Sequence, residues 1–124
     1  MVQEKKAIHI SRSEENIRYQ DSITIVDPKA VGDNKRVITI LLISETIKSE
    51  EKEEKEIIVT VYWQESDIEI FEESYDKIET ALTKYNDIVE RAKEIDKLLS
   101  VDQINEAVDA SKELLDELNQ SEDK

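Results

Sequence analysis

The feature that most constrains the fold of this chain is an abrupt change of residue pattern near residue 65. Before that point apolar residues alternate with polar ones, as in β-strands, and after it they recur every three or four residues, as in helices. The charge changes too: residues 1–48 hold eight Lys or Arg and seven Asp or Glu, whereas residues 49–124 hold nine and twenty-four. We therefore predict an α+β protein, a β-sheet part (1–65) followed by acidic helices, in a single domain of residues 1–124.

Four segments of the first part have the composition and period of strands, and their order predicts an antiparallel four-stranded meander. The only Pro and the only Gly of the chain fall in residues 27–34, which predicts a turn there. The last two segments are apolar on both faces and should be central, joined by a charged hairpin tip over residues 49–56. The predicted strands are residues 5–12, 17–26, 36–47 and 57–63, with Ile17 and Tyr19 on the same face.

The second part predicts a long amphipathic first helix, about residues 66–99. Ser66 and Glu69 have the Ser-x-x-Glu spacing of a capping box, and apolar residues follow in steps of three and four. A competing interpretation makes residues 67–71 a fifth strand and begins the helix at Ser74.

A second capping box at residues 100–103 predicts that the chain breaks and starts a new helix there. This acidic second helix would cover residues 100–118 and, because the joint is short, form an antiparallel two-helix hairpin with the first. The polar residues 119–124 are expected to be a frayed tail.

The composition excludes several classes of function. There are no Cys residues, and one Gly and one His in the chain are too few for a phosphate-binding glycine loop or the common zinc sites. We therefore expect no enzyme, no catalytic residue, no cofactor and no metal. No apolar run approaches the roughly 20 residues that span a bilayer, and we expect a cytoplasmic protein. A net charge of −14 repels nucleic acid and membrane surfaces, which leaves basic proteins as partners.

One acidic pattern suggests where such a partner binds. Five carboxylates of the second helix recur in steps of three and four, which places them on the side opposite the apolar residues. They form the expected partner-binding row: Asp102, Glu106, Asp109, Glu113 and Asp116. The row is also compatible with an ordinary solvated helix face. A further alternative is a nucleic-acid mimic that inhibits a DNA- or RNA-binding protein, as small acidic proteins of viruses or mobile elements do.

Self-association is the other expectation. Two helices cover one face of a small sheet, so the apolar residues of the other face need a partner, most simply a second copy in a homo-dimer or higher oligomer. The regular apolar pattern of the first helix could add a coiled-coil contact. A last alternative is a small-molecule sensor with a pocket lined by Tyr19, Tyr62 or Tyr85. The residues expected to self-associate are Val37, Leu41, Ile43, Ile58 and Tyr62.

Overall fold

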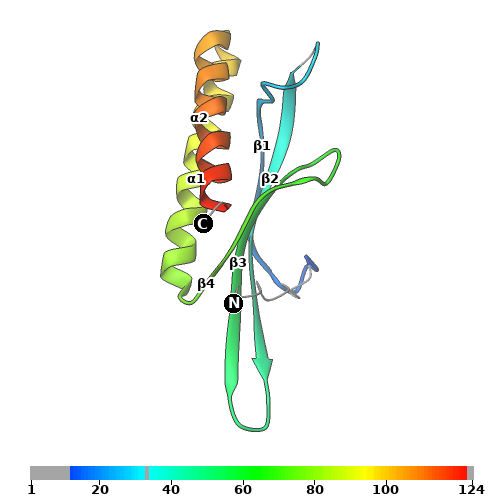
Figure 1. The fold of residues 1–124 in the computed structure, drawn as a ribbon, viewed down its shortest axis with the longest axis vertical. Coiled ribbons are helices and arrows are strands. Elements are labelled where there is room, and N and C mark those ends of the chain that lie inside the picture. The colour runs from blue at the N-terminus through cyan, green and yellow to red at the C-terminus, as the bar shows by residue number, and fades with distance from the viewer. Residues whose placement is uncertain (1–11, 33, 123–124) are drawn as a thin grey trace, which may run out of the picture.

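The computed structural model describes residues 12–32 and 34–122, which form one sheet and two helices (Figure 1). The strands pair antiparallel in the order β1-β2-β3-β4. The predicted fold class, a four-stranded antiparallel meander followed by two packed helices, is confirmed. The elements are β1 (Ile17–Val26), β2 (Lys35–Lys48), β3 (Glu53–Trp63), β4 (Glu69–Tyr75), α1 (Ile78–Ser100) and α2 (Ile104–Glu122).

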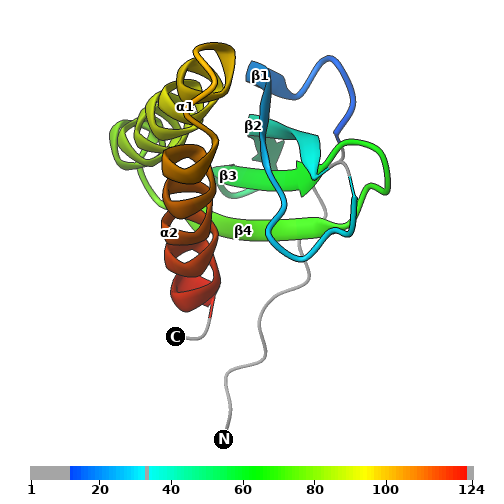
Figure 2. The same ribbon diagram turned by 90° about the horizontal axis from the view of Figure 1, so that it is seen from above.

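Both helices lie on the same face of the sheet (Figures 1 and 2), and the main core fills the space between. Each large aliphatic side chain buried there contributes about 1.5 to 3 kcal/mol to folding. The central strands supply the middle of this core, as their apolar composition predicts. Its fully buried members include Ile38, Ile40, Val59 and Val61 of the strands, and Ala81, Ile88, Ala92 and Ala107 of the helices.

The opposite face of the sheet holds a smaller apolar group, which we call the outer cluster: Leu41, Ile43 and Ile58, with Ile17 and Tyr62 packed against them. Ile17 lies opposite Ile43, whereas Tyr19 lies opposite Leu42, because the register shifts between them. Ile17 and Tyr19 therefore do not share a face. The prediction that they do is wrong because a β-bulge reverses the alternation at that point.

The predicted long helix over residues 66–99 is wrong in its first part, because residues 69–75 form β4 and α1 begins at Ile78. The competing interpretation, which placed a strand at residues 67–71, is closer to the structure. Phe71 and Tyr75 are four residues apart, a spacing that puts them on one face of a strand as well as of a helix. The strand forms because it pairs with β3, with Phe71 opposite Val61.

Ser66 does not cap a helix. Its hydroxyl accepts a hydrogen bond from the backbone N–H of Ile68, with 3.3 Å between Oγ and N, inside the turn from β3 to β4. In this turn Asp67 has a φ of 62°, and its N–H donates to the carbonyl of Trp63 at 2.7 Å. A Ser that accepts a bond from the residue two places on is typical of a turn, so the capping-box pattern has a second interpretation here.

The second capping box is also wrong, because Ser100 is the last residue of α1 and its hydroxyl donates to the carbonyl of Lys97. The joint is a Schellman motif instead. The N–H of Gln103 donates to the carbonyl of Leu98 at 2.9 Å, and Asp102 takes the left-handed conformation with a φ of 61°. The predicted break is in the right place, but it ends one helix rather than capping the next.

Two other boundaries differ from the prediction, and one predicted strand is not tested. The hairpin between β2 and β3 stays paired as far as Lys48 and Glu53, so the second half of the predicted charged tip, residues 53–56, belongs to β3. Helix α2 continues to Glu122, beyond the predicted end at residue 118 and into the expected tail. The predicted strand over residues 5–12 lies, except for Arg12, outside the described residues.

Candidate protein-interaction surface

The five carboxylates predicted to bind a partner are all exposed, and we call them the carboxylate row: Asp102, Glu106, Asp109, Glu113 and Asp116. Four of them lie on α2, on the side of the helix away from its buried residues, as a turn of 100° per residue requires. Asp102 lies in the joint between the helices instead. The side of α2 that faces the sheet is formed by Ala107, Ser111, Leu114 and Leu118.

In the described part of the chain, no residue of the carboxylate row forms a salt bridge. A neighbouring acid behaves differently. Glu117 accepts a hydrogen bond from Arg91 of α1, with 2.6 Å between Oε1 and Nη1, and this bond lowers the pKa of Glu117 below its ordinary value. Arg91 is engaged by Glu117, and none of the salt bridges among the described residues involves a carboxylate of the row.

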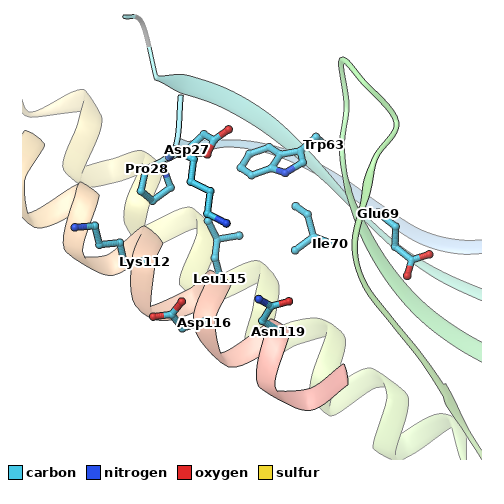
Figure 3. A pocket seen from close by; sticks show the side chains of 10 residues that line it. Asp27, Pro28, Trp63, Glu69, Ile70, Lys112, Leu115, Asp116 and Asn119 are labelled. Carbon is cyan, nitrogen blue, oxygen red and sulfur yellow. Dashed lines mark hydrogen bonds between the residues drawn. The ribbon is translucent and has the colours of Figure 1, made fainter. Parts of the chain in front are cut away.

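A groove of about 600 Å³ lies beside the carboxylate row, between α2, the turn after β1 and the start of β4 (Figure 3). Trp63, Ile70 and Leu115 form its apolar floor, and Asp116 belongs both to the groove and to the row. A concave site with an apolar floor and a few charged groups is the usual form of a binding site. The other lining residues are Asp27, Pro28, Lys29, Glu69, Lys112 and Asn119.

Trp63 is held in place from one side. The guanidinium carbon of Arg36 lies 4.7 Å from the centroid of the indole ring, and Arg36 forms a salt bridge of 2.8 Å with Asp27. This cation–π contact orients the indole, and the ion pair neutralises the one groove carboxylate that is buried. The remaining charges at the groove are those of Lys29, Lys112, Glu69 and Asp116.

The sequence did not indicate this groove. Its floor comes from β3, β4 and α2, which meet only through the sheet pairing and the packing of α2 on β4. The sequence pattern predicts a helix at Ile70, and a helix there does not place Ile70 beside Trp63. The only signal in the sequence was Trp63 itself, the single Trp of the chain.

Four of the five residues expected to self-associate lie together in or against the outer cluster, and three of them are buried within the single chain. Leu41, Ile43 and Ile58 are 1%, 2% and 1% exposed in the outer cluster, and Tyr62 packs against them. Val37 is partly buried on the same face of β2. These residues therefore do not form the uncovered apolar face from which self-association was predicted. Self-association itself stays a prediction.

The three tyrosines expected around a small-molecule pocket do not gather. The hydroxyl of Tyr85 donates to Asp21, with 2.7 Å between the oxygens, and the ring of Tyr19 packs against Tyr85 at 5.7 Å. Tyr62 lies on the other face of the sheet, where Arg12 stacks on its ring at 4.0 Å. Burial and the bond to Asp21 raise the pKa of the Tyr85 hydroxyl above its ordinary value.

Over residues 12–32 and 34–122, no three acidic or imidazole side chains are grouped closely enough to hold a metal ion. No helix in the described part of the chain has the length and apolar character needed to cross a membrane. Comparison of the chain with family models, with curated proteins and with solved structures finds no match.

Proposed function

We propose that this protein is a non-catalytic interaction module that binds a basic protein surface through the carboxylate row on α2 and in the joint before it. The observation that supports this proposal is the exposure of all five carboxylates together with the lack of salt bridges to the described cations of the chain. A row of like charges in water costs self-repulsion, which a complementary basic surface relieves on binding. The overall charge of −14 adds long-range attraction for such a partner.

A more specific candidate is inhibition of a nucleic-acid-binding protein by mimicry. Along α2 the carboxylates from Glu106 to Asp116 recur in steps of three and four residues, a rise of about 5 Å each. The phosphates of one DNA strand repeat about every 3.4 Å, so the row offers a regular line of anions to a cleft that binds phosphates. The regularity of the row supports the mimic as a candidate, although its repeat is longer than that of the phosphates.

Two double variants with the same change of net charge test the use of the row. Glu106→Lys with Glu113→Lys reverses two charges of the row, and Glu90→Lys with Glu94→Lys reverses two exposed charges of α1. We expect the α2 variant to bind a Lys-rich helical peptide at least tenfold more weakly than the α1 variant, with a smaller dependence on salt. Equal affinities of the two variants would refute the row as the binding surface.

The mimic is tested by competition. A basic nucleic-acid-binding domain is loaded with a labelled DNA or RNA duplex, and the protein is added at low salt. Displacement of the duplex by the wild-type protein, and not by the α2 variant, is the expected result. Simultaneous binding of duplex and protein to every such domain tried would reject the mimic and leave the more general proposal.

A further inference from the structure

We propose that the groove beside α2 accepts one large apolar side chain of the basic partner, whose Lys and Arg residues lie along the carboxylate row. The partner segment is therefore a basic amphipathic helix with an apolar anchor. This inference rests on the proposed function, and it adds the chemistry of the partner and its position on this surface.

The groove is suited to an apolar anchor. Trp63, Ile70 and Leu115 are each only partly buried by the chain itself, so a side chain placed on them removes further apolar surface from water. The volume of about 600 Å³ is within the range of sites that enclose a ligand of several heavy atoms. Trp63 does not need to reorient, because Arg36 already fixes its ring. A preorganised aromatic floor is typical of the residues that dominate binding energy.

The charges around the groove give the orientation of the partner. Asp116 lies on the border between groove and row, so the anionic surface continues from the groove along α2 to Glu113 and Asp109. Lys29 and Lys112 lie at the groove as well and repel cations there. The basic residues of the partner consequently lie along the row, and the residue in the groove is uncharged. A partner helix that lies beside α2 satisfies both requirements. Its apolar residue then faces the groove, and its cations face the carboxylate row.

The single Trp of the chain provides the readout, because Trp63 forms part of the groove floor. Two Trp-free helical peptides of Lys and Ala are titrated, one with a single central Phe and the other with Ala at that position. We expect the Phe peptide to bind at least tenfold more tightly and to shift the emission of Trp63 to shorter wavelength. The Ala peptide should bind more weakly and leave the emission unchanged.

Variants of α2 locate the effect. Leu115→Gln should remove most of the tenfold advantage of the Phe peptide. Ile104→Gln is the matched control, since Ile104 is an exposed apolar residue of the same helix, 39% exposed, that does not line the groove. Lys112→Glu removes a repelling cation and should tighten binding of both peptides several-fold, a gain that loss of folding cannot produce.

The outcomes separate the two proposals. Equal affinity for both peptides with unchanged Trp63 emission overturns the groove as the anchor site, while salt-sensitive binding of both still supports the carboxylate row. Failure of both peptides to bind the wild-type protein at low salt overturns the proposed function and the groove with it. Tightening of the Phe peptide by Leu115→Gln would also contradict the inference.

Discussion

The side-chain oxygen of Ser111 accepts a hydrogen bond from the backbone N–H of Val26, with 3.1 Å between Oγ and N. Val26 is the last residue of the edge strand β1, and Ser111 lies in the middle of α2, 85 residues later in the chain. Both residues are 0% exposed. The bond therefore satisfies a backbone donor that water cannot reach, and it fixes the height of α2 relative to the sheet.

Ser111→Ala should destabilise the protein by about 1 to 3 kcal/mol, because it leaves the buried N–H of Val26 without an acceptor. Chemical denaturation of the variant and the wild type measures the difference. Ser100→Ala is a suitable control, since Ser100 is exposed and donates only to the carbonyl of Lys97 in its own helix. The control should lie within about 0.5 kcal/mol of the wild type. Equal stability of all three proteins would show that the Ser111 bond contributes nothing.

A second prediction concerns alkaline pH. The pKa of the Tyr85 hydroxyl is raised above its ordinary value of 10.0 by burial and by the hydrogen bond to Asp21. Above pH 10 the unfolded chain loses this proton while the folded chain keeps it, so stability is fully present below that pH and falls as the pH rises. Tyr85→Phe should reduce the slope of this fall and cost about 1 kcal/mol at neutral pH. Thermal unfolding from pH 8 to pH 11 measures both effects.

Some dependence of stability on pH should persist in Tyr85→Phe, because the pKa of Tyr75 is raised as well. An unchanged slope in the variant would contradict the assignment.

The meander and the two-helix order could be predicted from periodicity alone, but the identity of the fourth strand could not. Phe71 and Tyr75 fit either a strand or a helix, because a spacing of four residues is two periods of a strand and about one turn of a helix. What decides between them is the free edge of β3, a property of the assembled sheet. The local sequence of residues 69–75 does not show which edge of the sheet is left unpaired by the other strands.

The candidate site likewise has one part that the sequence predicts, the carboxylate row, and one part that it does not predict, the groove. The exposure of Glu106, Asp109, Glu113 and Asp116 follows from helical period, since one helix positions them all. The groove forms only when Trp63 of β3, Ile70 of β4 and Leu115 of α2 come together. The sequence pattern predicts a helix at Ile70, and with that prediction the three residues are not expected to be neighbours. Surfaces built on one element are accessible to sequence reasoning, whereas those built by tertiary packing need the fold first.

The joint between the helices gives a third prediction, because Asp102 occupies a left-handed position with a φ of 61° where Gly is preferred. Asp102→Gly should stabilise the protein by about 0.5 to 1 kcal/mol by relieving backbone strain. Asp102→Val should destabilise it by more than about 1 kcal/mol, since β-branched residues disfavour this conformation. Thermal denaturation measures both changes. Asp109→Gly, in the interior of α2, is the control and should lose roughly 1 kcal/mol. A loss of stability for Asp102→Gly similar to that control would show that the joint is not strained.

The last prediction asks whether the outer cluster is core or interface. Leu41 is 1% exposed within one chain, so Leu41→Ala should cost about 2 to 5 kcal/mol from lost burial and the cavity left behind. As a core effect, this loss does not depend on protein concentration, and sedimentation equilibrium should give the same mass for variant and wild type. Val37→Ala, on the same face but only partly buried, is the control and should cost about 1 kcal/mol or less. If Leu41 instead belongs to a contact between two copies, its replacement lowers the sedimenting mass, and the stability loss shrinks on dilution because the wild type dissociates as well.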